Sequence, residues 1–165
     1  MRDPARELQE VLAHEIPITT AIGIAVAHYD GETLTLTAPL RQNRNHKSTA
    51  FAGSLNALVT LTGWGLIWLI LKERDIPATI VIQESTSRYL SPVRDDFTAH
   101  CRKPSEARLA AFETTLRRRG KARLELHVQI GDGATLAMDF TGRYVVHARE
   151  RPASVPEHKE NAPTP

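Results

Sequence analysis

Several residues able to take part in chemistry lie in a polar loop immediately before a long apolar segment. The loop contains Asn43, Asn45 and His46, and no charged side chain occurs between Phe51 and Leu71. The unperturbed pKa of a histidine side chain is about 6.5, so His46 can act as a general base near neutral pH. The alternative is that His46 is an ordinary surface histidine.

The start of the apolar segment, Ala52-Gly53-Ser54, offers a second kind of chemistry if the segment is a helix. The first N–H groups of a helix lack partners within it and lie at its positive dipole end. Glycine lets a substrate carbonyl approach the backbone closely, so an oxygen that becomes negative during a reaction would be stabilised beside Gly53. The alternative is that Gly53 only allows close packing against a strand.

Glu84 is a further candidate, on a β-branched segment that follows the apolar one. It has the same parity as Ile80 and Ile82, so we expect its side chain to face inward. A buried carboxylate is costly without a partner or a task, so we expect Glu84 either to pair with an arginine or to be catalytic.

The composition disfavours several other chemistries. The seven histidines show no HExxH or similar ligand spacing, which argues against a metal site. No serine lies in a G-x-S-x-G motif, which argues against a serine-triad hydrolase. The net charge of +2 and the single basic triplet, residues 117–119, give no nucleic-acid-binding pattern.

Cys101 is the only cysteine and no apolar signal core follows Met1, so we expect a cytoplasmic protein.

Two interpretations of the apolar segment compete. About twenty apolar residues are a candidate membrane span, but a helix that is apolar all round is also typical of one buried inside a protein. Asn56, Thr60 and Thr62 interrupt the run, and the basic residues that flank both ends give no orientation bias. The segments on both sides alternate like amphipathic strands, which a span would separate. We therefore predict a buried helix and no membrane span.

The remaining patterns predict one domain over residues 1–148 and a disordered tail over residues 149–165, where apolar periodicity is lost. In chain order we expect a helix over 4–16, strands over 22–29 and 33–40, the apolar helix from about 51 to 74, strands over 79–89 and 96–102, a short helix between 105 and 120, and strands over 124–130 and 136–147. Six strands and one fully apolar helix predict an α+β fold in which an antiparallel sheet wraps around the helix.

Two motifs resemble those of hot-dog-fold thioesterases, in which such a sheet surrounds a long central helix. "NRNHKSTAFAGSL" (residues 43–55) resembles a pattern of the thioesterase family that also forms the C-terminal domain of YiiD-type acetyltransferases, and it leads into Gly63-Trp64-Gly65. "SRYLSPVRDD" (residues 87–96) resembles the strand end with an aromatic residue, an apolar residue and proline that is common in hot-dog thioesterases. The resemblance covers about residues 5–148.

The resemblance implies a thioesterase that acts on acyl-CoA or acyl-carrier-protein substrates by direct attack of water. On the matching positions, Gly53 would stabilise the thioester oxygen and Asn45 would orient the water. Most hot-dog hydrolases carry an acid in the loop or on the helix, and here residues 41–72 contain none. His46 and Glu84 therefore stay open as alternative general bases.

Basic and polar residues around the two motifs are the candidates for binding the thiol carrier. The phosphates of coenzyme A favour Arg or Lys at the mouth of a cleft, and an acidic carrier protein would use the same charges. The residues assigned to substrate binding are Asn43, Lys47, Ser54, Arg88, Tyr89 and Arg94, with Arg44 nearby. We expect no cofactor other than the coenzyme A of the substrate.

Two alternative functions belong to the same fold. The first is a protein that binds an acyl thioester without hydrolysing it, which the missing helix carboxylate supports. The second is a dehydratase or hydratase, which needs a histidine and an acid, here His46 and Glu84. Hot-dog sheets usually join edge to edge, so the resemblance also implies a homodimer or homotetramer.

Overall fold

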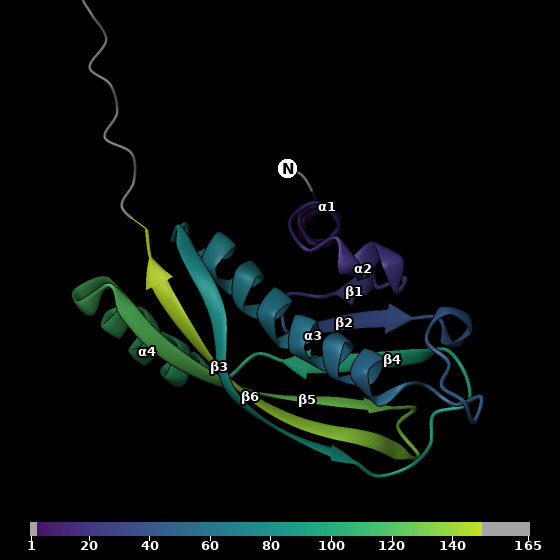
Figure 1. The fold of residues 1–165 in the computed structure, drawn as a ribbon. Coiled ribbons are helices and arrows are strands. Elements are labelled where there is room, and N and C mark those ends of the chain that lie inside the picture. Colours follow the sequence, from purple (N-terminus) through teal and green to yellow (C-terminus); the bar gives the residue numbers. More distant parts are fainter. Residues whose placement is uncertain (1–2, 150–165) are drawn as a thin grey trace, which may run out of the picture.

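The computed structural model describes residues 3–149 and shows a six-stranded antiparallel sheet curved around one long helix (Figure 1). Apart from Arg149, the tail predicted to be disordered lies outside the described residues. In chain order the elements are α1 (Pro4–Glu15), α2 (Ile18–Ala21), β1 (Ala25–Tyr29), β2 (Thr33–Ala38), the 3-10 helix η1 (Leu40–Gln42), α3 (Ala52–Glu73), β3 (Ala78–Tyr89), β4 (Phe97–Arg102), α4 (Glu106–Arg119), β5 (Lys121–Gly131) and β6 (Leu136–Ala148).

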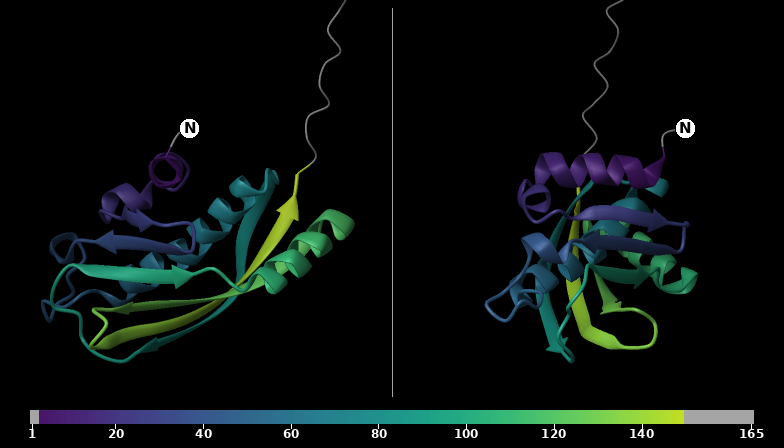
Figure 2. Two further views of the ribbon diagram at one scale, coloured as in Figure 1. Left: turned by 180° about the vertical axis from the view of Figure 1, so that it is seen from behind. Right: turned by 90° about the vertical axis from the view of Figure 1, so that its right-hand side faces the viewer.

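The strands follow the order β1-β2-β4-β5-β6-β3 across the sheet. The chain leaves β2, runs through α3 and returns at the opposite edge as β3, so the helix lies across the concave face of the sheet. Figure 2 shows the strands curving around α3, with α1 and α2 on the β1 side. α1 packs against both β1 and α3. The predicted α+β fold, a sheet wrapped around a buried helix, is confirmed.

α3 forms the centre of the hydrophobic core. It contacts five of the six strands, and its leucine and isoleucine side chains are almost completely buried. Within residues 3–149 it is the one helix long and apolar enough to cross a membrane, and 67% of its apolar window is buried inside the fold. That placement is typical of a core helix, so the prediction that this segment is interior is confirmed.

Two glycines allow α3 to lie close to its neighbours. A side chain at Gly63 would overlap with the buried ring of Tyr144, whose hydroxyl donates to the carbonyl oxygen of Thr60 (2.8 Å). A side chain at Gly65 would press against Leu8 of α1 and against β2. These glycines therefore have a packing role in the middle of the core.

The strands face the core with the alternation predicted from the sequence. In β2 and β5 the buried side chains alternate with more exposed ones. The buried apolar residues of these two strands are Leu34, Leu36, Ala38, Ala122, Leu124, Leu126, Val128 and Ile130.

The first strand begins later than the sequence predicts. Its expected start, Ile22, follows the short helix α2, and β1 begins only at Ala25. Two local contacts that apolar alternation does not reveal delay the start of the strand. The Thr19 hydroxyl donates to the carbonyl oxygen of Leu12 (3.0 Å), which fixes α2 against α1, and Gly23 has a φ of +70°, which turns the chain before the strand.

Replacing Gly63 by alanine should lower the free energy of unfolding, because the new methyl group overlaps with the closely packed Tyr144 ring. Overpacking a core costs about 1–3 kcal/mol, which exceeds the roughly 0.5–1 kcal/mol gained by removing a glycine from a helix. Urea unfolding measures the difference. The cost of Gly63→Ala should be smaller in a Tyr144→Phe background, which lacks the hydroxyl; equal costs in both backgrounds would contradict the contact.

Candidate active site

The loop that precedes α3 is shaped by Asn45. Its Oδ1 accepts hydrogen bonds from the backbone N–H groups of Lys47 (2.8 Å) and Thr49 (3.2 Å). Its Nδ2 donates to the Thr49 hydroxyl (3.0 Å) and to the carbonyl oxygen of Ala50 (3.3 Å). Both ends of the amide are therefore engaged within the loop. This arrangement gives Asn45 a structural task, and its predicted role in orienting water stays a prediction.

Asn43 connects the loop to the rest of the fold. Its side chain donates to the carbonyl oxygens of Ile22 (2.8 Å) and Pro39 (2.7 Å), and its own carbonyl accepts from the N–H of Phe51 (2.7 Å). Asn43 is only 2% exposed, so the residue predicted to bind substrate lies beneath the surface that a substrate can touch. It supports the start of α3 from below.

The first turn of α3 has no side-chain cap. The residue before it is Phe51, and the N–H groups of Ala52 and Gly53 have no hydrogen-bond partner in the part of the chain that the structure describes. By contrast, Asp3 caps α1 and Ser105 caps α4. Ala52 and Gly53 are exposed. The central helix thus has two unpaired donors in an exposed first turn at its positive dipole end, beside the ring of Phe51, which suits a carbonyl oxygen or an anion.

Two other predicted site residues lie nearby, Ser54 in the first turn of α3 and His46 in the loop before it. Ser54 is buried on the inner side of the turn. His46 is exposed at the tip of the loop, beyond the paired residues Asn45 and Thr49. Arg44 and Asn45 separate His46 from Asn43, whose carbonyl oxygen accepts from the N–H of Phe51.

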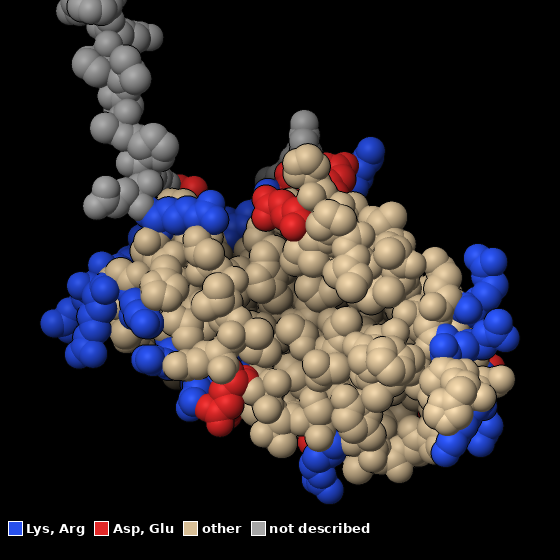
Figure 3. All heavy atoms as spheres, in the orientation of Figure 1, with Lys and Arg blue, Asp and Glu red and all other residues tan. Residues whose placement is uncertain are grey.

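Basic residues gather around the same end of the molecule. Arg44 and Lys47 are exposed on the loop, and Arg94 is exposed on the segment between β3 and β4. The N–H of Ala50 donates to the carbonyl oxygen of Val93 (2.8 Å), which holds the two segments together. In Figure 3, Lys and Arg cluster at opposite ends of the molecule, and the face between them carries few charged side chains.

Glu84 does not face inward as its parity predicts. The pairing of β3 with β6 shifts register between Ile82 and Glu84, and this bulge turns the rest of the strand over. The side chain of Glu84 is 64% exposed on the outer face, where it pairs with Arg143. Gln83 lies on the same face and accepts from Arg123 (3.0 Å). Of the two alternatives left open for Glu84, a pairing with an arginine or a catalytic role, the structure shows the pairing, and the expected inward direction is wrong.

The two residues predicted to bind substrate at the end of β3 lie on opposite faces of the sheet, because successive side chains of a strand alternate. Arg88 pairs with Asp139 and, like Glu84, lies on the outer face of the sheet. Tyr89 lies on the inner face, and its hydroxyl is 3.5 Å from the carbonyl oxygen of Ala52. The structure therefore brings Tyr89 to the start of α3 and leaves Arg88 on the opposite side of the sheet.

Sequence reasoning missed one polar contact at this site. The hydroxyl of Ser87 in β3 donates to Oδ1 of Asn56 in the second turn of α3 (2.8 Å). From the sequence, Asn56 was considered only as a polar residue that disfavours a membrane span. An asparagine within an otherwise apolar helix could have indicated a polar contact, but its partner lies 31 residues away and only the fold brings the two together.

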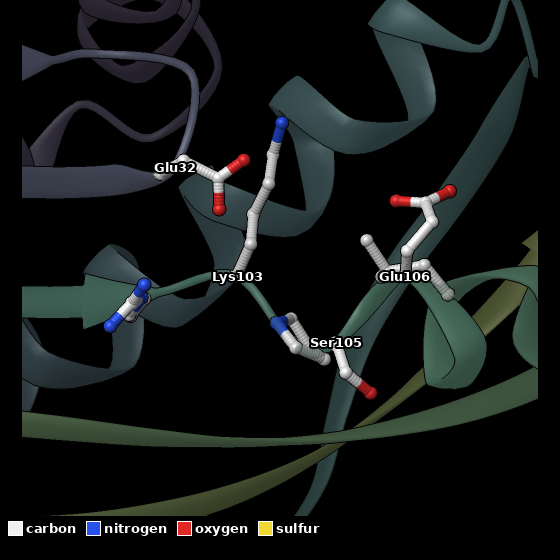
Figure 4. Close-up of a pocket in the computed structure, with 7 residues that line it drawn as sticks. Glu32, Lys103, Ser105 and Glu106 are labelled. Atoms are coloured by element: carbon white, nitrogen blue, oxygen red, sulfur yellow. The ribbon is translucent and has the colours of Figure 1, made fainter.

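A separate cleft of about 420 Å³ lies at the other end of α3 (Figure 4). Three of its polar side chains already have partners: Lys103 forms an ion pair with Glu73 (2.7 Å), Glu106 forms one with Arg74 (2.8 Å), and Ser105 caps α4. The residues that line it are Glu32, Arg102, Lys103, Pro104, Ser105, Glu106 and Leu109.

Thiol and metal chemistry have little support in residues 3–149. Burial raises the pKa of the Cys101 thiol to about 12, so it is a poor nucleophile at neutral pH. No group of three or more His, Cys, Asp or Glu side chains in this part of the chain is arranged to hold a metal ion.

Comparison with known proteins shows the family to which this chain belongs. Residues 5–148 match the sequence model of the family described as "Putative thioesterase (yiiD_Cterm)". A protein of unknown function from Chlorobaculum tepidum is 33% identical, with 88% of this chain and 94% of that one covered and a TM-score of 0.85. A putative thioesterase from Shewanella oneidensis is 32% identical, with 88% and 98% covered and a TM-score of 0.78.

More distant structures share the fold alone. A thioesterase from Haemophilus influenzae is 16% identical, with 97% of each chain covered and a TM-score of 0.64. The predicted hot-dog fold is therefore confirmed.

Replacing Asn43 by alanine should destabilise the protein, because the carbonyl oxygens of Ile22 and Pro39 lose their donor. A buried polar group left without a partner costs about 1–3 kcal/mol. His46→Ala, an exposed change in the same loop, should alter stability by less than about 0.5 kcal/mol. Chemical denaturation of both variants checks the difference, and equal stabilities would show that Asn43 does not hold the loop.

Proposed function

Because the chain belongs to the YiiD C-terminal thioesterase family, we propose that it hydrolyses acyl thioesters of coenzyme A or of an acyl carrier protein. Water attacks the carbonyl carbon, and the π electron pair moves onto the oxygen. The carbon–sulfur bond breaks as the carbonyl re-forms. One proton of the water ends on the departing sulfur, so the products are a carboxylic acid and a thiol.

The uncapped start of α3 is the observation that carries this proposal. The N–H groups of Ala52 and Gly53 have no partner in the part of the chain that the structure describes, and both residues are exposed. The ring of Phe51, itself 55% exposed, lies against Gly53 where a side chain would otherwise sit. A thioester oxygen bound there gains hydrogen bonds that strengthen as it becomes an oxyanion. Removing one such donor from an enzyme typically lowers kcat by about 10²–10³-fold.

The loop residues support the proposal in different ways. Asn45 acts as a positioning residue, because its hydrogen bonds shape the loop that leads into Phe51 and the first turn of α3. His46 is exposed at the tip of the same loop. As the alternative general base it would take a proton from the attacking water.

A non-hydrolytic acyl-thioester-binding protein is the second candidate, and one observation favours it. α3 carries no carboxylate before Glu73, which lies at its far end and bonds to Tyr29 and Lys103. A dehydratase has less support, because Glu84 lies on the outer face of the sheet, away from the start of α3.

The edge strand β3 supports a homodimer. It is 12 residues long, and Val81 and Ile82 are 46% and 39% exposed. A long edge strand with an apolar half, here residues 80–82, invites pairing with another chain when it is left open. The part of α3 that is least covered faces the same side, and its half-buried residues are Asn56, Ala57, Thr60, Trp64 and Trp68. A second copy paired along β3 would cover this uncharged face and enclose the acyl chain.

The basic residues at the start of α3 fit the carrier. Arg44 and Lys47 are exposed on the loop before α3, and Arg94 is exposed on the segment that Val93 joins to it. Coenzyme A phosphates or an acidic carrier protein would lie against these charges. Arg88 is separated from them by the sheet, so its contribution is smaller in this arrangement.

The wild-type protein should release thiol from acyl-CoA substrates of graded chain length, measured with a thiol reagent. Ala52→Pro removes one free N–H but suits the first position of a helix, because Phe51 before it is already extended (φ −68°, ψ 131°). We expect kcat to fall on the order of 10²-fold with stability unchanged.

Ala52→Gly keeps the N–H and is the matched control. If the Ala52→Pro variant and the wild type had equal kcat, the Ala52 N–H would have no part in stabilising the oxyanion. Tight binding of acyl-CoA by the wild type without thiol release would favour the binding protein instead.

The protein should have a mass of at least twice the 18.3 kDa of one chain in light scattering at micromolar concentration. Ile82→Arg should produce monomers, because it places a charge in the middle of the proposed β3 interface. Ile18→Arg, an exposed apolar residue of α2 on the other side of the sheet, should leave the mass unchanged. A monomeric wild type, or dissociation caused only by the α2 change, would contradict the β3 interface.

A further inference from the structure

One side chain beside the start of α3 is oriented by a residue of another element. The Ser87 hydroxyl donates to Oδ1 of Asn56, so the acceptor end of the amide faces β3. The Nδ2 end therefore points away from Ser87. It is not a buried atom, and it has no partner within the described residues. The contact thus leaves Asn56 with two oriented, free N–H donors.

These donors lie over the first turn of α3. Asn56 comes three residues after Gly53, and side chains on a helix lean toward the preceding turn. The strand that carries Ser87 passes along the same turn, since the Tyr89 hydroxyl lies 3.5 Å from the carbonyl oxygen of Ala52. The amide of Asn56 and the N–H groups of Ala52 and Gly53 therefore share one side of the helix start.

A structural link between α3 and β3 explains only part of this arrangement. Asparagine is a weaker helix former than alanine by up to about 0.7 kcal/mol, and the rest of the helix is almost entirely apolar. Joining the two elements requires one acceptor for the Ser87 hydroxyl, and an asparagine supplies two donors as well. Free donors of this kind are useful where negative charge develops.

We propose that Asn56, held by Ser87, donates a hydrogen bond to the thioester carbonyl oxygen beside the Gly53 N–H. The inference rests on the proposed thioester hydrolysis and names a side-chain member of its oxyanion site. As water adds to the carbonyl carbon, the electron pair that moves onto the oxygen is stabilised by the Asn56 amide and the backbone together. When the carbon–sulfur bond breaks, the carbonyl re-forms and this stabilisation weakens. Ser87 acts as the positioning residue.

Steady-state hydrolysis of acyl-CoA by five variants tests the assignment. Asn56→Ala should lower kcat on the order of 10²-fold with little change in KM, because the bond strengthens in the transition state. Asn56→Asp should be at least as impaired, because a carboxylate cannot donate and repels the oxyanion. Ser87→Ala should lower kcat by roughly tenfold, and Ser87→Thr, which keeps the hydroxyl, should restore most of it.

Thr86→Val is the matched control. It removes a hydroxyl from the neighbouring position on the outer face of β3 and should leave kcat unchanged. Urea unfolding of each variant separates loss of the contact from loss of the fold, and the two Ser87 variants carry the test if Asn56→Ala is unstable.

The outcomes distinguish this inference from the function on which it rests. A kcat of Asn56→Ala within about twofold of the wild type would overturn the donor role while hydrolysis stands. An Asn56→Asp variant as active as the wild type would also overturn it, since the side chain would then act as an acceptor. A wild type that releases no thiol from any acyl-CoA would refute the proposed hydrolysis and the assignment together.

Discussion

The fold depends on the burial of one helix that is apolar on nearly every side. Side chains such as Leu58, Leu66 and Ile67 are completely buried, and each contributes roughly 1.5–3 kcal/mol by leaving water. A helix with a single apolar stripe can lie on the surface of a sheet, but α3 needs cover around most of its circumference. The curvature of the sheet and the close contacts at Gly63 and Gly65 follow from that need.

The same constraint decides where polar backbone groups can meet a ligand. A buried helix still ends in unpaired N–H and C=O groups, which must reach the surface or find partners. At the C-terminal end of α3, the carbonyl oxygens of Ile70, Leu71 and Lys72 accept from N–H groups of the residues that follow the helix. At the N-terminal end, Phe51 supplies no cap, and the donors of the first turn are left for an external acceptor. The stability of the core and the chemistry of the site are therefore linked through one element.

The arrangement around this helix start favours polarisation of a carbonyl over proton abstraction. α3 has no carboxylate before its last residue, Glu84 is paired on the outer face, and the Asn45 amide is engaged in the loop. What gathers at the first turn is a set of hydrogen-bond donors, from the backbone and from Asn56. Such a site would stabilise negative charge on a bound oxygen, as the proposed hydrolysis requires.

The sequence by itself determined the architecture of this protein, because period and capping signals are local. The alternation in β2 and β5, the caps at Asp3 and Ser105 and the apolar run of α3 each predict an element without knowledge of its neighbours. The two motifs then pointed to the hot-dog thioesterase fold, and Gly53 to the start of the helix.

Only the tertiary structure decided which side chains meet at that helix start. One added residue in β3 reverses the faces of Glu84 and Arg88, and the sequence gives no sign of a bulge that arises from pairing with β6. The contact between Asn56 and Ser87 joins residues 31 positions apart, and the engagement of Asn45 depends on how its loop closes. Side-chain direction depends on strand register and on contacts between distant segments, and neither is encoded in a local pattern.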